Sequence, residues 1–286
     1  MHSPLRAPIP IETLLLAYRS GIFPMADSRE DQEVFWVEPR DRAIIPLEGL
    51  YISKSLAKAI RQDRYIVTLD RAFEDVIHAC AAPRPGHPES WISDRIVESY
   101  VGLHRAGHAH SVECWDGDTL VGGLYGVSFD RVFCGESMFS RADNASKVAL
   151  VWLVALMRAA GFKLLDCQFM TDHLATLGAI EMPQKAYLKL LDEARGRASA
   201  GLHEAYAALT NQVSASSEGS SSLASSSSPS SGASSGSPAS VTRRVQHKSA
   251  SRHTAGSVEG SSASRIASAL LHSALTCWLP RTSSTA

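Results

Sequence analysis

The sequence predicts an α+β protein, and the order of segments in its second half carries that prediction. Residues 110–127 read as two strands joined by the turn at 116–118, and a third strand follows through residue 140. An apolar helix at 145–161 and a nearly all-apolar strand at 162–170 come next. Such an order favours a mixed sheet flanked by helices.

The first half supplies shorter elements. Residues 11–20 have helical periodicity and stop at Gly21, and Ile22–Met25 forms an extended turn. An irregular connection at 35–47 leads into a strand bounded by prolines. Then follow, in order, a helix at 52–64, a strand at 65–70, a helix at 72–81 and an amphipathic helix at 94–107 that ends at Gly107.

In the second half, Asn144 is the expected N-cap of the apolar helix. The strand at 162–170 has the composition of one covered on both faces. A short helix at 173–181 and a final helix at 185–194 complete the folded part. The order of meander, buried helix, central strand and helix is that of GNAT-type acyltransferases.

Composition divides the chain into a folded part, residues 1–212, and a tail. The folded part is long enough for one large domain or two small ones. From residue 214 to residue 240, 16 of 27 residues are serine, which is the composition of a flexible linker. We therefore expect residues 213–286 to be disordered, with a weak helix at 266–279 as the alternative for the end.

Composition also excludes several classes of protein. The apolar run at 148–157 is too short to span a membrane, and prolines interrupt the start where a signal peptide needs apolar residues, so the cytoplasm is expected. The five cysteines are odd in number and widely spaced, so they predict neither disulfides nor a metal site. A cysteine nucleophile at Cys134 or Cys167, with His173 as its base, stays a minor alternative.

Acidic and amide residues stand out among the apolar strands. Glu136 lies in the string C-G-E-S-M-F-S, and Asp166 and Gln168 lie in L-L-D-C-Q-F. Either carboxylate alone could cap a strand end or a helix. Together with Met138 and the pair Gly122–Gly123 they indicate a site, because carboxylates are rarely buried without a partner or a task.

These strings resemble a known family. The pieces A-Y-R-S-G-I-F-P-M, S-W-I, L-H-R-A-G-H-A-H-S-V-E, L-V-G-G-L-Y-G-V, F-C-G-E-S-M-F-S, A-S-K-V-A-L, L-L-D-C-Q-F and H-L-A-T-L-G-A occur in the order found in leucyl/phenylalanyl-tRNA-protein transferases. The resemblance covers residues 11–194. It implies a small α/β N-terminal domain, which we expect at residues 1–62, and a GNAT-like catalytic domain at residues 63–212.

The resemblance implies a transferase that moves Leu, Phe or, less readily, Met from aminoacyl-tRNA to the α-amine of proteins with N-terminal Arg or Lys and so marks them for degradation. We expect a monomer and no cofactor. An acyl-CoA-dependent N-acetyltransferase is one alternative, but residues 140–147 lack the glycine-rich turn that binds pyrophosphate. A non-catalytic module that binds tRNA or basic N-termini is the other.

The resemblance also implies roles for the polar residues. Gln168 and Asp166 match positions held to drive catalysis. An amide oxygen accepts hydrogen bonds but is not a useful base, so we expect Gln168 to orient the amine and Asp166 to fix that amide or to receive the proton indirectly. Glu136 could favour the cationic acceptor or lock the orientation of Gln168.

Further positions follow from the same resemblance. The donor side chain is expected in an apolar pocket formed by Leu124, Phe133, Met138 and Leu165. Ordinary core packing is the alternative for each of these four.

The expected contact for the terminal adenine is Trp91. The second aromatic residue of the family is Met25 here, for which Trp36 or Phe23 could compensate. Thr171 replaces an asparagine, which leaves open whether this position polarises the donor carbonyl.

The formal net charge of -1 argues against broad RNA binding. A local patch is enough for an acceptor stem. Lys54, Lys58 and Arg61 fall at i, i+4 and i+7 of the helix at 52–64, so they share one face, which Arg64 could extend. They are the candidate tRNA contacts, with a merely solvated helix face as the alternative.

Overall fold

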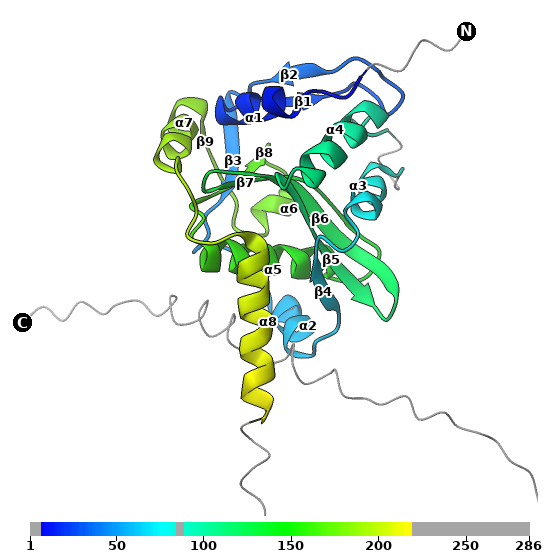
Figure 1. The fold of residues 1–286 in the computed structure, drawn as a ribbon, viewed down its shortest axis with the longest axis vertical. Helices are drawn as coiled ribbons and strands as arrows, with labels where there is room; N and C mark the ends of the chain where they lie inside the picture. The colour runs from blue at the N-terminus through cyan, green and yellow to red at the C-terminus, as the bar shows by residue number, and fades with distance from the viewer. Residues whose placement is uncertain (1–6, 84–88, 219–286) are drawn as a thin grey trace, which may run out of the picture.

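The computed structural model describes residues 7–83 and 89–218. Its centre is a seven-stranded sheet (Figure 1). In spatial order the strands are β4 (Ile66–Leu69), β5 (Ala109–Asp116), β6 (Thr119–Phe129), β7 (Val132–Ser140), β8 (Leu164–Gln168), β3 (Asp41–Ile45) and β9 (Ile180–Pro183). All neighbours are antiparallel except β7 and β8, which are parallel. The predicted α+β fold with a mixed sheet flanked by helices is confirmed.

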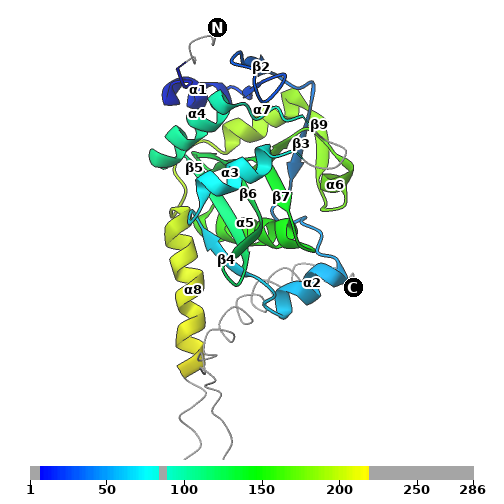
Figure 2. The same ribbon diagram turned by 90° about the vertical axis from the view of Figure 1, so that its right-hand side faces the viewer.

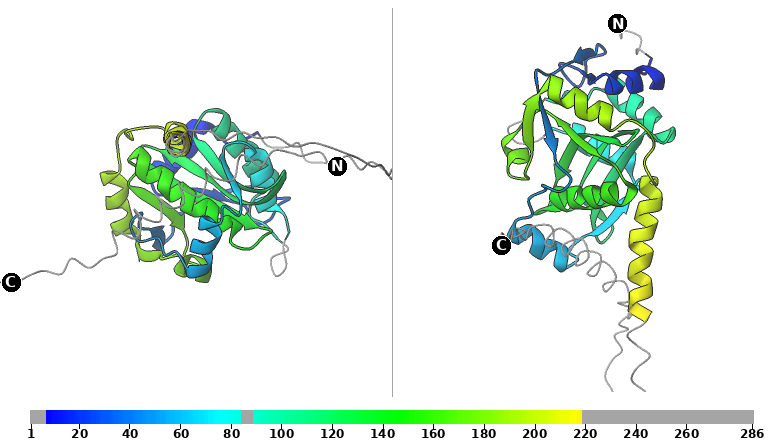
Figure 3. Two further views of the ribbon diagram at one scale, coloured as in Figure 1. Left: turned by 90° about the horizontal axis from the view of Figure 1, so that it is seen from below. Right: turned by 90° about the vertical axis from the view of Figure 1, so that its left-hand side faces the viewer.

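Helices cover both faces of this sheet. On one face lie α2 (Lys54–Arg61), α5 (Ala145–Ala160) and α8 (Leu202–Glu218), whose buried residues share one apolar core. On the other lie α1 (Ile11–Arg19), α3 (Phe73–Ala81), α4 (Asp94–Arg105) and α7 (Gln184–Glu193), which form a second core. Figures 2 and 3 show α8 projecting at the end of the molecule opposite α1.

The N-terminal segment lies over the second core. The helix α1 ends before Gly21, whose φ of 77° is the left-handed conformation predicted for that stop. The strand β1 (Phe23–Met25) then pairs with β2 (Phe35–Val37) in a separate two-stranded sheet. The next strand, β3, joins the main sheet between β8 and β9. A division at residue 62 therefore leaves one strand of the main sheet on its N-terminal side.

Two strands at the centre of the sheet are bulged. Tyr125 of β6 pairs with Ser137 and Gly126 pairs with Gly135, so Glu136 of β7 is the extra residue. A bulge of this kind changes which face the following side chains meet.

The bulge in β8 has the same form. Ala43 of β3 pairs with Gln168 and Ile44 pairs with Asp166, which leaves Cys167 as the extra residue. Gln168 has a φ of 58°, a left-handed conformation that is unusual for a residue other than glycine. The strand thus ends with its backbone turned at Gln168.

The prediction that Asn144 is the N-cap of α5 is confirmed, although its side chain makes no capping hydrogen bond. Two other local predictions are wrong in detail. The segment expected as one helix at 173–181 consists of the short helix α6 (Asp172–Ala175) and the start of β9. The helix α7 is not the last, because α8 follows and reaches Glu218, inside the segment expected to be disordered.

The rest of the serine-rich tail, including the alternative helix at 266–279, lies outside the described residues. Within residues 7–83 and 89–218, the helices are all too short or too polar to cross a membrane.

Candidate functional site

A cavity of about 1100 Å³ lies where β7 and β8 separate. The two strands pair only over Val132–Cys134 and Leu164–Asp166, after which β7 continues to Ser140. Residues 135–141 and 167–169 line the cavity beyond that pairing, together with side chains from α5, α6 and β1. The cavity is therefore bounded by the two motifs that the sequence singled out.

The apolar part of the cavity contains most of the predicted donor pocket. Leu124, Met138 and Leu165 line it, and Leu150 and Leu153 of α5 complete the wall. Leucine and methionine side chains adapt to ligands of different shape. An elongated aliphatic or aromatic group would fit against this apolar wall.

Phe133 is not among the lining residues, contrary to expectation. Its side chain is fully buried and packs on Gly126, where an added Cβ would collide with the Phe133 ring. It lies in the core beside α5 together with Leu124 and Leu165, which do reach the cavity. Phe133 therefore supports the cavity wall from the core.

The polar part of the cavity is formed by Gln168 and Glu136. The Gln168 amide donates from Nε2 to Glu136 Oε1 at 2.9 Å. Among the described residues, no hydrogen-bond partner faces Gln168 Oε1, and that side chain lines the cavity. The contact with Glu136 thus orients the amide so that its acceptor oxygen is left for a ligand.

Two tyrosines bind Glu136 from the other side. Tyr18 of α1 donates to Oε1 at 2.8 Å, Tyr100 of α4 donates to Oε2 at 3.2 Å, and the two hydroxyls contact each other. Burial raises the pKa of Glu136 to about 8, although the tyrosine hydrogen bonds act in the opposite direction. Burial also raises the pKa of both tyrosines, so they remain hydroxyl donors.

A protonated Glu136 completes this network. Its Oε2–H can donate to Tyr100, Tyr100 to Tyr18, and Tyr18 back to Oε1, which still accepts from Gln168. A neutral, fully bonded carboxyl group is poorly suited to attract a cationic acceptor. The geometry favours the other predicted role of Glu136, which is to lock Gln168.

Asp166 belongs to a buried ion pair. Its Oδ1 accepts from Arg42 Nε at 2.8 Å and its Oδ2 accepts from Arg42 Nη2 at 2.6 Å, with both side chains fully buried. Oδ1 also accepts from the backbone N–H of Gln168 at 3.0 Å, and Oδ2 accepts from Tyr187 at 3.3 Å. Asp166 does not line the cavity. It fixes the backbone of Gln168 rather than its amide, and it is not placed to meet a substrate.

The sequence patterns do not identify Arg42 as part of the site. Its guanidinium lies between the rings of Phe23 and Tyr187, 4.9 and 4.4 Å from their centroids, and it donates to the carbonyl of Gly21 at 3.0 Å. The available signal was an arginine inside a short strand of buried residues, since an arginine is seldom fully buried without a partner.

Tyr18, Tyr100 and Tyr187 were missed as well. Each lies on the apolar face of its helix, where the sequence pattern does not distinguish a tyrosine of the site from one that only packs in the core.

The remaining predicted substrate contacts meet at the cavity. Trp91, Met25, Phe23 and Thr171 all line it, whereas Trp36 does not. Thr171 Oγ1 accepts from the backbone N–H of Leu174 and caps α6, which leaves its hydroxyl hydrogen available. Trp91 thus shares the cavity with Phe23 and Met25.

The cysteines do not form a nucleophilic site. Cys134 is buried and Cys167 lines the cavity, and burial raises the pKa of both thiols, with the Asp166 carboxylate adding to the effect. A thiol without a lowered pKa is a weak nucleophile at neutral pH. This alternative loses its support.

The three predicted tRNA-binding cations are all exposed on α2. Lys54, Lys58 and Arg61 lie on the outer side of this helix, while Leu56, Ala59 and Ile60 face the core beside α5. A phosphate-binding face and a merely solvated face would both be exposed in this way, so the exposure of the three cations agrees with either alternative.

Comparison with known proteins gives matches over most of the described chain. A family model described as "Leucyl/phenylalanyl-tRNA protein transferase N-terminal domain" matches residues 8–40, and one described as "Leucyl/phenylalanyl-tRNA protein transferase" matches residues 44–192.

Curated proteins named leucyl/phenylalanyl-tRNA–protein transferase are similar throughout this region. The one from Novosphingobium aromaticivorans is 64% identical over 205 residues, which cover 72% of this chain and 78% of that protein. The one from Rhizorhabdus wittichii is 58% identical over 185 residues, 65% of this chain and 75% of that protein. The solved structure of L-PGS from Bacillus licheniformis covers 59% of this chain and 56% of its own, with 13% identity and a TM-score of 0.31.

We predict that Arg42→Met strongly destabilises the protein, because it leaves the Asp166 carboxylate buried without its counter-ion. The expected loss in the free energy of unfolding is about 3–5 kcal/mol. Urea denaturation measures it. Arg105→Met, which breaks an exposed pair with Glu74, should cost less than about 1 kcal/mol. Equal losses in the two variants would show that the buried pair contributes no more to stability than the exposed pair does.

We predict that Glu136 makes the protein less stable as pH rises. The folded protein holds the Glu136 proton up to pH about 8, whereas the unfolded chain releases it near the ordinary pKa of 4.5. The free energy of unfolding should therefore fall between these two pH values. Glu136→Gln should flatten that slope in denaturation curves at several pH values. The exposed Glu74→Gln should leave it unchanged, and an identical slope in both variants would contradict the assignment.

Proposed function

The chain belongs to the leucyl/phenylalanyl-tRNA protein transferase family, and from that premise we propose that it moves leucine or phenylalanine from aminoacyl-tRNA to the α-amine of proteins with N-terminal arginine or lysine. Methionine is a weaker donor, and the product is marked for degradation under the N-end rule. The reaction takes place in the cytoplasm on the monomer. The supporting observation is one cavity with an apolar wall and the oriented amide of Gln168.

The donor side chain occupies the apolar wall. Leu124, Met138 and Leu165 contact it, and Phe133 supports them from behind. A wall of flexible side chains accepts linear and ring-shaped groups alike. Discrimination against valine and isoleucine then rests on clashes at their β-branch, worth about 1–3 kcal/mol in an apolar pocket.

The 3′-terminal adenosine stacks on Trp91. Base–aromatic stacking contributes about 1–3 kcal/mol per base. Met25 lies where a second aromatic residue would stand and offers a thioether contact instead, and Phe23 lines the same cavity. Trp91 supplies the aromatic contact for the end of the tRNA, and Met25 and Phe23 add apolar contacts beside it.

The reaction itself needs little acid–base strength. The acceptor nitrogen attacks the ester carbonyl carbon, the new C–N bond forms, the bond from that carbon to the ribose oxygen breaks, and the amine proton ends on the ribose oxygen. The ester is already activated, and an α-amine with a pKa of about 7.7–8.0 is partly neutral at physiological pH. Positioning is therefore the main task.

Gln168 performs that positioning. Its Oε1 accepts a hydrogen bond from the acceptor amine and so points the nitrogen lone pair at the donor ester. Glu136 holds the amide, and Asp166 holds the backbone N–H of the same residue. Asp166 and Glu136 are positioning residues, because neither is free to bind the amine.

The cationic side chain of the acceptor needs a carboxylate at the cavity. Among the described lining residues, only Glu136 and Asp172 carry carboxyl groups. Glu136 is occupied by tyrosines, whereas Asp172 is exposed in the first turn of α6. Asp172 is therefore the group that favours arginine and lysine over neutral residues.

The acceptor stem of the tRNA binds along α2. Lys54, Lys58 and Arg61 are exposed on one helix, and a short run of cations can follow neighbouring phosphates. The weak net charge of the chain limits RNA binding to such a local face.

The first test is transfer of radiolabelled leucine from Leu-tRNA to peptides that differ only in an N-terminal Arg, Lys or Ala. Transfer to Arg and Lys but not to Ala is expected. Asp172→Asn should raise KM for the Arg peptide by about 10-fold, the worth of roughly 1.4 kcal/mol of binding. Binding of tRNA without transfer would support a non-catalytic module. Protection by acetyl-CoA against thermal unfolding would support the N-acetyltransferase.

A second prediction concerns Gln168. Gln168→Ala should lower the rate constant for transfer by about 100-fold or more, because the amine loses its orienting acceptor, while the affinity for Leu-tRNA stays nearly unchanged. Single-turnover transfer and a separate tRNA-binding titration give the two quantities. Gln62→Ala, at an exposed position after α2, is the matched control and should leave the rate constant unchanged. Wild-type turnover by Gln168→Ala would remove the proposed role.

A third prediction concerns α2. Reversing Lys54, Lys58 and Arg61 to glutamate should raise KM for Leu-tRNA. The slope of log KM against the logarithm of the salt concentration should become smaller by roughly 0.7–0.9 for each phosphate contact that is lost. The rate constant should stay the same. Reversal of Lys185 and Lys189, exposed on α7 on the other face of the sheet, is the control. Equal effects of the two reversals would indicate a general effect of charge.

A further inference from the structure

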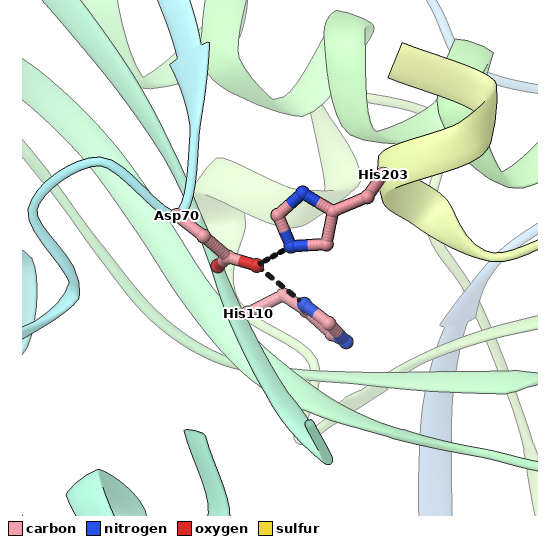
Figure 4. A group of neighbouring side chains, drawn as sticks. All are labelled: Asp70, His110 and His203. Carbon is pink, nitrogen blue, oxygen red and sulfur yellow. Dashed lines mark hydrogen bonds and ion pairs between the residues drawn. The ribbon is translucent and has the colours of Figure 1, made fainter. Parts of the chain in front are cut away.

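A carboxylate and two imidazoles converge at the edge of the sheet, away from the cavity (Figure 4). Asp70 follows the edge strand β4, His110 lies in β5, and His203 lies in the first turn of α8. Asp70 Oδ2 is 2.7 Å from His110 Nδ1 and 2.7 Å from His203 Nε2. The three potential ligand atoms all lie within 4.8 Å of one another.

The carboxylate is held in place by its backbone surroundings. Ser111 donates its N–H to Asp70 Oδ1 at 2.7 Å, and Asp70 donates its own N–H to the Ser111 carbonyl at 2.9 Å. Asp70 adopts a φ of 58°, a left-handed conformation that costs energy in a residue other than glycine. These contacts leave Oδ2 facing the two histidine rings. Outer contacts of this kind orient the ligands of metal sites.

The three potential ligand atoms would need only small movements to coordinate one metal ion. Tetrahedral zinc with ligand bonds of about 2.0–2.1 Å places its ligand atoms roughly 3.3 Å apart. The two contacts with Asp70 would have to lengthen by about half an ångström. His203 can supply that movement, because its side chain is 63% exposed at the start of a helix.

We propose that Asp70, His110 and His203 bind one divalent transition-metal ion of the zinc type, with water as the fourth ligand. One carboxylate and two neutral imidazoles are a usual ligand set for such an ion. On binding, each ring carries its proton on the nitrogen away from Asp70. The cysteines, from which the sequence predicts no metal site, take no part.

The ion would tie α8 to the sheet edge. On either side of His203, α8 buries Leu202 and Ala205, and it donates from the Tyr206 hydroxyl to the Val67 carbonyl of β4 at 3.0 Å. The site thus joins the last described helix to β4 and β5 at its first turn. None of the three ligands lines the cavity, so the role is structural and does not depend on the proposed function.

Metal titration of the full-length protein tests the proposal. Protein treated with a chelator and then dialysed is titrated with Zn²⁺ in a calorimeter and with Co²⁺ in a visible absorption experiment, since Co²⁺ reports a tetrahedral ligand field. One equivalent should bind to the wild type, and Zn²⁺ should raise the melting temperature.

Asp70→Asn and His203→Ala should each weaken that equivalent by more than about 10-fold, the least that disturbance of a metal site's immediate surroundings costs. His203→Ala changes an exposed residue and keeps the proposal testable if Asp70→Asn does not fold. His78→Ala, exposed on α3, is the matched control and should bind as the wild type does.

The absence of binding by the wild type, or binding that both site variants retain in full, would overturn the proposal. The three residues would then form only a hydrogen-bonded contact between α8 and the sheet. Transfer activity is measured in parallel on the same samples. Loss of transfer with intact metal binding, or the reverse, separates failure of the proposed function from failure of the metal site.

Discussion

The buried pair of Arg42 and Asp166 is the interaction on which the geometry of the site depends. Arg42 lies on β3, donates to the Gly21 carbonyl after α1, and stacks on Tyr187 of α7. Asp166 lies on β8 and accepts the backbone N–H of Gln168. The N-terminal segment, the sheet and α7 thus meet at one ion pair. The free-energy cost of removing two charges from water roughly cancels their mutual attraction. The pair therefore fixes the positions of its neighbours more than it stabilises the fold.

The two carboxyl groups next to Gln168 meet different partners. Asp166 faces the Arg42 guanidinium in a bidentate pair, whereas Glu136 faces two tyrosine hydroxyls and an amide, and burial raises its pKa to about 8. One group fixes the backbone of Gln168 and the other fixes its side chain. A charged Glu136 beside Asp166 would repel it across a buried space, so the neutral form suits the arrangement.

The sequence predicts the elements of this fold better than their contacts. Helical periodicity, the glycine stop after α1 and the apolar strand β8 depend on residues near one another in the chain, so local patterns reveal them. The contacts of Arg42 with Asp166 and of Tyr18 with Glu136 span 124 and 118 residues. Local patterns carry no sign of such pairs, and the resemblance identified Gln168 and Glu136 without their partners.

Phe133 and β9 show two predictions that failed for physical reasons. The resemblance grouped Phe133 with Met138, and both side chains do pack in the core beside α5, but only Met138 lines the cavity. A resemblance identifies positions in the chain and does not show which of two core side chains reaches the cavity. The strand β9 is short and exposed at the sheet edge, so it lacks the apolar alternation that identifies a strand.

The two bulges explain how polar and apolar groups reach one cavity. The residues on either side of the sheet belong to separate cores, one beside α5 and one beside α1 and α4. Regular strands would keep Glu136 and Met138 on one face, because they are two residues apart. With Glu136 as the extra residue of β7, its carboxyl group turns to Tyr18 and Tyr100 while Met138 packs towards α5.

The bulge at Cys167 has the same effect on β8. Leu165 packs with the core beside α5, and Gln168 ends the strand with its amide at Glu136. An apolar binding wall and an oriented hydrogen-bond acceptor therefore face the same space where β7 and β8 part. The placement of the proposed donor pocket next to the proposed acceptor site follows from these two irregularities, and a sheet of regular strands would separate them.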